Sequence, residues 1–145
     1  KNGFIKYIGV TTSHGLRHKK LEAIINNHDL DFLQLTYNIL DNEASNYLLP
    51  LAEERGIAVI ANRPFQGGKL FNIVNDKKIP TFAIDIGIKS WAEYFLKFIT
   101  SHKTITCTIP ATSKINHMQQ NMQALYGSIP TSLQRKKLYK LFINL

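Results

Sequence analysis

Short apolar runs and longer amphipathic stretches alternate along the chain. The run Ala58-Val59-Ile60-Ala61 is too short and too rich in β-branched residues for a helix, so it predicts a strand buried on both faces. By the same pattern we predict strands at 4–10, 32–37 and 105–109. Helical spacing of apolar residues predicts helices at 19–27, 46–55, 90–99, 115–125 and 131–143.

Local signals refine these elements. Gly56 lies where the helix over 46–55 should end, and Pro50 either kinks that helix or lies in its first turn. A long loop follows residue 61 and runs through Ile79-Pro80. In the helix over 90–99, the helical spacing of its four aromatic residues favours packing in the core over contact with a ligand: Trp91, Tyr94, Phe95 and Phe98.

The first three predicted strands begin near positions 4, 32 and 57, which is the spacing of βαβ units. We therefore expect an α/β fold with a parallel sheet, in which ligands bind at the carboxyl ends of the strands. The polar residues at those ends are the candidate site: Thr11-Thr12, Thr36-Tyr37-Asn38, Asn62-Arg63-Pro64-Phe65 and Ala111-Thr112-Ser113-Lys114.

Length and composition fit one globular domain. The chain has 145 residues, of which 44% are hydrophobic and 19% charged, and no apolar run reaches the roughly 18 residues that a membrane helix needs. Its start, Lys1-Asn2-Gly3, suggests a cut end with no signal peptide. Cys107, the single cysteine, has apolar neighbours, so we expect a buried small side chain and a reducing, cytoplasmic setting.

Charge is distributed unevenly. The net charge is +8, and residues 94–145 contain seven basic residues and no Asp or Glu. Such a field attracts polyanions, either nucleic acid or a phosphorylated cofactor, although a solvated basic surface explains the charge equally well. The histidines show no spacing typical of a metal site, so we predict no metal and place His14, His18, His28 and His102 on the surface or in loops.

Four stretches, taken in order, resemble the second half of an aldo/keto reductase: IKYIGVTT, DFLQLTYNILD, GIAVIANRPFQGG and TIPATSKINHMQQNMQA. The resemblance spans residues 5–124. It implies the C-terminal half of a TIM (β/α)8 barrel, strands five to eight, with residues 1–145 forming a single partial domain that ends in the helix over 131–143. It also implies a carbonyl substrate and the cofactor NADP(H), with NAD possible.

The resemblance implies cofactor contacts from fourteen residues: Thr11, Thr12, Gln34, Asn62, Arg63, Pro64, Phe65, Gly67, Thr112, Ser113, Lys114, His117, Gln120 and Asn121. In the family, the residues at the first three positions hold the nicotinamide amide, and those at 112–121 hold the 2′-phosphate and the adenosine. The physical chemistry agrees: Gly67-Gly68 lets backbone approach a phosphate, Arg63 and Lys69 supply charge, and the helix after Lys114 directs free N–H groups at an anion.

Each feature also has a structural explanation. Thr11-Thr12 and Thr112-Ser113 can be turn or capping residues, Gln34 can satisfy a neighbour, Gly67-Gly68 can be a flexible turn, and the basic residues at 135–140 can form one face of an amphipathic helix. The chain also departs from the family at two positions. It has Asn62 where a stacking Tyr is common, and His117 where an Arg often binds the 2′-phosphate.

The family's catalytic tetrad (Asp, Tyr, Lys and His) belongs to the first four strands, so we expect no catalytic residue in this chain and no activity from it alone. A half-barrel would leave open strand edges and an uncovered apolar interior. The missing half-barrel or a second copy of the chain could cover them. The second hypothesis is therefore a non-enzymatic, self-associating half-barrel that binds nucleotide or nucleic acid; for a reductase we expect neither a membrane nor a nucleic-acid partner.

Overall fold

Strands and helices alternate through the computed structural model, which describes residues 3–12 and 17–145. The sequence pattern located the four strands, although the first is shorter than predicted. In chain order the elements are β1 (Gly9–Thr11), α1 (His18–Asn27), β2 (Phe32–Thr36), η2 (Glu43–Asn46), α2 (Leu48–Glu54), β3 (Ala58–Asn62), η3 (Gln66–Gly68), α3 (Lys69–Ile73), α4 (Thr81–Asp85), α5 (Trp91–Thr100), β4 (Ile105–Thr108), α6 (Ile115–Gln123) and α7 (Ser132–Ile143).

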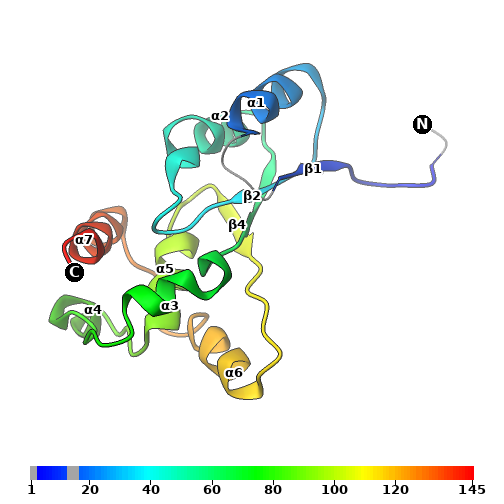
Figure 1. Ribbon diagram of the computed structural model, residues 1–145. Helices are drawn as coiled ribbons and strands as arrows, with labels where there is room; N and C mark the ends of the chain where they lie inside the picture. Colours follow the sequence, from blue (N-terminus) through cyan, green and yellow to red (C-terminus); the bar gives the residue numbers. More distant parts are fainter. Residues whose placement is uncertain (1–2, 13–16) are drawn as a thin grey trace.

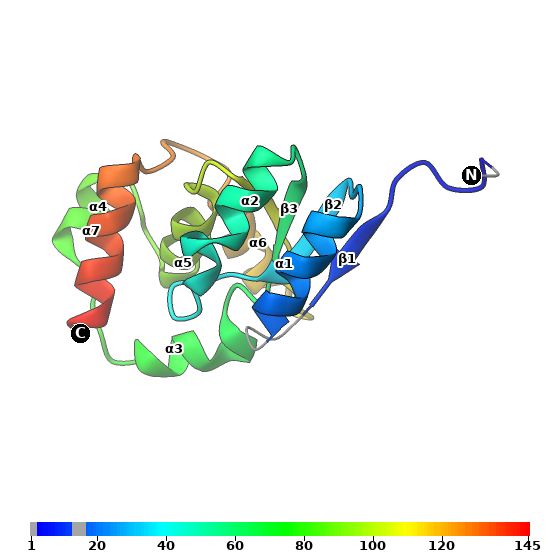
Figure 2. The same cartoon turned by 90° about the horizontal axis from the view of Figure 1, so that it is seen from above.

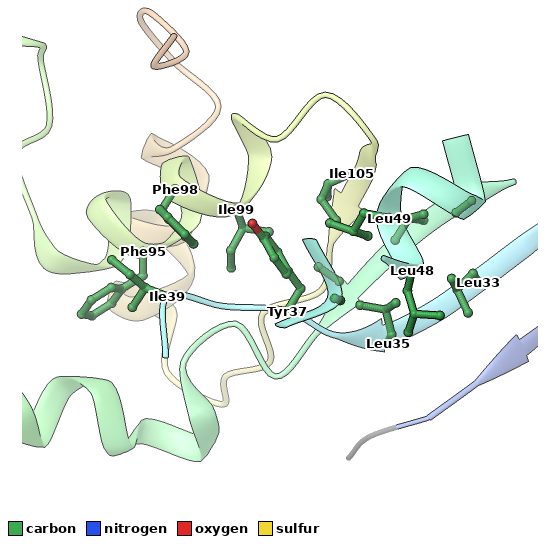
Figure 3. Packing of buried hydrophobic residues seen from close by; sticks show 14 of the residues in the cluster. Leu33, Leu35, Tyr37, Ile39, Leu48, Leu49, Phe95, Phe98, Ile99 and Ile105 are labelled. Carbon is green, nitrogen blue, oxygen red and sulfur yellow. The ribbon is translucent and has the colours of Figure 1, made fainter. Parts of the chain in front are cut away.

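The four strands form one parallel sheet in the order β1-β2-β3-β4, which confirms the predicted α/β fold (Figure 1). In its centre, Leu33 is paired with Val59 and Leu35 with Ala61. All four side chains are fully buried, because partners in a parallel pair point to the same face of the sheet. Leu48 and Leu49 of α2 lie close to Leu33 and Leu35 on this face (Figure 3).

The other face of the sheet is covered less well. On it, Phe32 and Cys107 are exposed, and Gln34, Ala58 and Ile60 are half-buried. Two predictions are therefore wrong: β3 is not buried on both faces, and Cys107 is not a buried side chain. The physical reason is the same for both, since Cys107 is paired with Ile60 on the face opposite the helices.

The first strand is shorter than predicted. The paired register with β2 begins only at Gly9, opposite Phe32, and Phe4 and Ile5 are 88% and 72% exposed. This segment extends away from the rest of the molecule (Figures 1 and 2). The segment is attached next to β2 at Ile8, whose backbone N–H donates a 2.9 Å hydrogen bond to Asp31 Oδ2.

The segment predicted as one long loop contains two short helices, α3 and α4. Each has five residues, too few to display a helical period in the sequence, so the prediction of a loop is wrong there. In α2, by contrast, Pro50 lies in the first turn, where its missing N–H is not needed, and Gly56 follows the helix with φ 66°.

An aromatic cluster on α5 joins the sheet to the C-terminal helix. Tyr94, Phe95 and Phe98 are buried and Trp91 is half-buried, as the helical spacing predicted. Phe95 makes an edge contact with Phe142 of α7, with ring centroids 5.7 Å apart. The Tyr94 hydroxyl donates a 2.6 Å hydrogen bond to the Leu138 carbonyl oxygen, so α7 is attached by both apolar and polar contacts.

His102 lies in a loop, one of the two positions predicted for it, and is buried there. Its ring packs edge-on against Tyr37, with centroids 5.7 Å apart. Burial, together with the positive charge of Arg135, lowers the pKa of His102 to about 4. His28 is exposed and His18 is half-buried at the start of α1, whereas His14 lies outside the described residues.

Stability should therefore depend on pH through His102. Because its pKa in the folded state lies below that of the unfolded chain, the unfolded state takes up more protons between pH 6.5 and 4, and stability falls as the pH falls through this window. We expect a loss of at most about 3 kcal/mol. Denaturant unfolding at several pH values measures this loss. His102→Gln should flatten the dependence of the free energy of unfolding on pH, and His28→Gln should not. Equal slopes in the native and His102→Gln proteins would contradict this assignment.

Candidate functional site

A cleft of about 790 Å³ lies beside the carboxyl ends of β3 and β4. Its wall comes from the loop after β3, α3, the segment after β4 and one side of α6, and Ala92 of α5 also lines it. The lining residues are Asn62, Arg63, Pro64, Phe65, Gly67, Gly68, Phe71, Ala92, Ile109, Ala111, Thr112, His117, Gln120 and Asn121.

The loop after β3 turns sharply because four of its residues have left-handed backbone conformations. Gly67 and Gly68, at φ 64° and 93°, adopt them without strain, whereas Arg63 and Gln66, at 49° and 51°, do so at a steric cost. No atom lies within 4 Å of the position that a Cβ would take at either glycine. Their backbone is therefore open to a ligand in the cleft.

Asn62 ties together the carboxyl ends of three strands. Its Oδ1 accepts a 2.8 Å hydrogen bond from Thr36 Oγ1, and its Nδ2 donates a 2.8 Å hydrogen bond to the Thr12 carbonyl oxygen. All three residues are buried. One loop further, Asn38 Nδ2 donates to the Arg63 carbonyl oxygen at 3.0 Å, so the loop after β3 is held to the loop after β2.

Nine of the fourteen predicted site residues line the cleft: Asn62, Arg63, Pro64, Phe65, Gly67, Thr112, His117, Gln120 and Asn121. Five do not. Thr11 and Gln34 are paired across β1 and β2 on the less covered face of the sheet, and the buried Thr12 donates its backbone N–H to the Gln34 carbonyl oxygen. Ser113 and Lys114 are exposed in the turn before α6.

Three lining residues were missed by the sequence reading: Phe71, Ala92 and Ile109. Phe71 belongs to α3, which the sequence showed only as loop, and it packs on Phe65 with ring centroids 4.9 Å apart. Ala92 lies on the helix whose four aromatic residues were predicted to pack in the core. No local sequence signal marks either residue, because only the packing of α3 and α5 beside the loop brings them to the cleft.

The cleft favours an anionic ligand. Among the residues that the structure describes, Arg63 and His117 are the charged or titratable residues in its lining, and no carboxylate lines it. At the start of α6, the Lys114 N–H donates to Thr112 Oγ1 and the His117 N–H to Asn116 Oδ1, so the N–H groups of Ile115 and Asn116 are the ones left for a ligand. In the loop after β2, burial raises the pKa of Asp41, an effect that the charges of His18 and Arg63 partly offset.

Comparison with known proteins gives the family. The model of the aldo/keto reductase family matches residues 1–132. The chain belongs to the aldo/keto reductase family. A curated relative, the NADH-specific methylglyoxal reductase of Escherichia coli K12, is 29% identical over 126 residues, an alignment that covers 81% of this chain and 39% of the relative.

Solved aldo/keto reductases share the fold. The holo form of AKR11C1 from Bacillus halodurans superposes with a TM-score of 0.74 at 19% identity, covering 96% of this chain and 51% of that one. The thermostable reductase Tm1743, in complex with the inhibitor epalrestat, gives a TM-score of 0.71 at 20% identity, covering 96% and 49%. This chain therefore has the fold of about half of an aldo/keto reductase barrel, and it spans about two fifths of its curated relative.

The Asn62 hydrogen bonds should stabilise the site as a unit. Asn62→Ala leaves the buried Thr12 carbonyl and Thr36 hydroxyl without this partner, so we expect a loss of about 1–3 kcal/mol in the free energy of unfolding. Denaturant titration measures it. Asn75→Ala, at an exposed position, is the matched control and should change stability by less than about 0.5 kcal/mol. A loss no larger than the control's would show that Asn62 does not hold the strands.

Proposed function

We propose that this chain is the cofactor-binding portion of a cytoplasmic, NAD(P)H-dependent aldo/keto reductase that reduces a carbonyl substrate. The observation that carries the proposal is the cleft at the carboxyl ends of β3 and β4, which has two open glycines, a helix N-terminus and no carboxylate. Family membership supports it, since the Bacillus halodurans relative is named as a reductase in a holo form.

The residues present fit a dinucleotide. A volume of about 790 Å³ lies in the range of cofactor sites, and the backbone of Gly67 and Gly68 can approach a pyrophosphate, with Arg63 nearby to neutralise it. Thr112, Ser113 and Lys114 would hold a phosphate at the start of α6, and His117, Gln120 and Asn121 would face the adenosine. The bound nicotinamide would supply a hydride to the carbonyl carbon.

Near the nicotinamide, we propose that the side chains of Asn62 and Gln34 have different roles. The Asn62 side chain already uses both its ends within the fold, so it would shape the cleft and position its neighbours. Thr11 and Thr12 at the end of β1, and Gln34 in β2 opposite Thr11, do not line the cleft and would hold the carboxamide. Pro64 and Phe65 would cover the ring from the loop after β3.

We propose NADP(H) as the cofactor, with NAD(H) as the alternative. Lys114 offers a positive charge near the start of α6, which favours a 2′-phosphate. Two observations favour NAD(H) instead. His117 is a weaker cation than an arginine near neutral pH, and the Escherichia coli relative is named NADH-specific. The two cofactors differ at the adenosine end, so this preference rests on residues 112–121.

The acid that protonates the developing alkoxide would come from outside this chain. Hydride transfer to a carbonyl needs a proton donor at the oxygen, with an acidity tuned by its neighbours. In the described part of the chain, the titratable residues lining the cleft are Arg63 and His117, both assigned here to the cofactor. We propose that the catalytic tetrad belongs to a preceding half of the barrel.

A second candidate function follows from the exposed apolar residues near β1. Phe4, Ile5, Tyr7 and Phe32 are between 37% and 88% exposed, an apolar surface that a second copy of the chain could cover. The chain would then be a self-associating binding module without reductase activity.

Cofactor binding tests the site. Lys114→Glu should weaken NADPH binding at least about tenfold, because it replaces a charge-assisted contact to the 2′-phosphate with repulsion, and should leave NADH binding within about twofold. Nucleotide fluorescence titration measures both. Lys89→Glu, an equal change of charge at an exposed position outside the cleft, is the control. Unchanged NADPH affinity in Lys114→Glu would remove the phosphate site from residues 112–114.

The native mass separates the two functions. An antibody to this region would capture the protein from its source cells for intact-mass measurement. We expect about twice the 16.5 kDa of this chain, as a whole barrel of ~250 residues or more requires. A mass of 16.5 kDa, with a dimer on gel filtration, would favour the binding module and rule out the proposed reductase.

A further inference from the structure

A second cavity, of about 720 Å³, lies between α7, α5 and the loop that contains η2. It shares no lining residue with the cleft described above. Tyr37, Phe98 and Tyr139 form its inner wall, and Asn42 and Ser45 contribute polar groups from the η2 loop. In Figures 1 and 2, α7 lies at the far end of the molecule from β1.

Four cationic side chains line this cavity, all from α7: Arg135, Lys136, Lys137 and Lys140. None of the described residues in its lining is an Asp or Glu, and neither residue type follows Glu93 in the sequence. Within residues 3–12 and 17–145 the ion pair is that of Lys103 with Glu53, far from α7 in the sequence, so these four charges are not neutralised by carboxylates. The cavity therefore concentrates positive charge.

Arg135 is held in place by the inner wall. Its Nη1 donates a 3.0 Å hydrogen bond to the Tyr37 hydroxyl, and its guanidinium carbon lies 5.9 Å from the centre of the Phe98 ring. Burial raises the pKa of Tyr37, which keeps the phenol neutral. The Nε of Arg135 is buried and has no hydrogen-bond partner within the described part of the chain. A fixed guanidinium in the lining of the cavity favours an anionic ligand there.

The three lysines that line the cavity differ in whether their ammonium groups contact another part of the chain. Lys137 Nζ lies 3.9 Å over the centre of the Phe82 ring, so its charge is engaged with α4. Lys136 and Lys140 lie one helical turn apart, are exposed, and their ammonium groups make no hydrogen bond or ion pair within the described residues. These two ammonium groups are therefore available at the rim of the cavity.

Apolar surface accompanies the charge. Phe98 and Tyr139 stack with ring centroids 6.4 Å apart, and at the ends of α7 Leu133 and Ile143 are 78% and 54% exposed. Such large exposed apolar side chains beside a cavity are typical of a ligand site. Apolar rings inside and cations at the rim together match a molecule with an apolar body and a charged head.

We propose that this cavity, the α7 site, binds a small amphiphilic anion: an apolar body carrying one carboxylate, sulfonate or phosphate group. The body lies against Phe98 and Tyr139, and the head group accepts hydrogen bonds from Arg135, Lys136 and Lys140. The volume suits a ligand of drug size. The proposal does not depend on the cofactor assignment, because the two cavities have no residue in common.

Decanoate is the probe, and isothermal titration calorimetry of the protein at its native length is the measurement. We expect decanoate to bind, decanol to bind at least about tenfold more weakly, and Lys136→Glu/Lys140→Glu to weaken decanoate at least about tenfold through charge reversal. Lys19→Glu/Lys20→Glu on α1 makes the same change in net charge at exposed positions and should leave the affinity within about twofold. Saturation with NADPH should not change it either.

Three results would overturn the α7 site: equal binding of decanol and decanoate, equal loss of affinity in both double variants, or displacement of decanoate by NADPH. If Lys136→Glu/Lys140→Glu loses its helical circular dichroism, the single variant Lys140→Gln replaces it and should weaken decanoate about twofold to fivefold. An affinity for decanoate unchanged in that variant would also overturn the proposal.

Discussion

The parallel register between β2 and β3 is the constraint on which the rest of the structure depends. Pairing Leu33 with Val59 and Leu35 with Ala61 turns four apolar side chains toward the helices. Because side chains alternate along a strand, a slip of one residue would turn all of them to the other face. The same register ends with Thr36 opposite Asn62, so it also brings together the polar groups that hold the loops of the cleft.

The sequence predicted the strands and those helices that are long enough to show a periodic spacing of apolar residues. The alternation of strands with amphipathic helices identified the sheet, and nine of fourteen expected site residues do line the cleft. What it missed depends on tertiary packing. Cys107 has apolar neighbours in the sequence, but the register shift between Val59 and Ile60 turns it to the uncovered face, whereas His102 lies in a loop where its ring packs against Tyr37. Helices of five residues, such as α3, are too short to show a helical spacing of apolar residues in the sequence.

The two cavities acquire positive character in different ways. The α7 site takes all four of its cations from the acid-free stretch after Glu93, whereas Arg63 and both glycines of the cleft precede that stretch. In the cleft the main contribution comes from backbone groups, at two glycines and a helix N-terminus, whereas in the α7 site it comes from side chains, one of them fixed by a phenol and an aromatic ring.

The order β1-β2-β3-β4, in which every strand pairs with its neighbour in sequence, also bears on how the chain folds. Gly9 pairs with Phe32, but Val59 pairs with Ile105, so the last pairing closes a loop about twice as long as the first. A doubling of loop length adds roughly 0.6 kcal/mol to the entropic cost of closure. Of the three strand pairings, that of β3 with β4 therefore carries the largest entropic cost of closure, and the cleft beside these two strands depends on it.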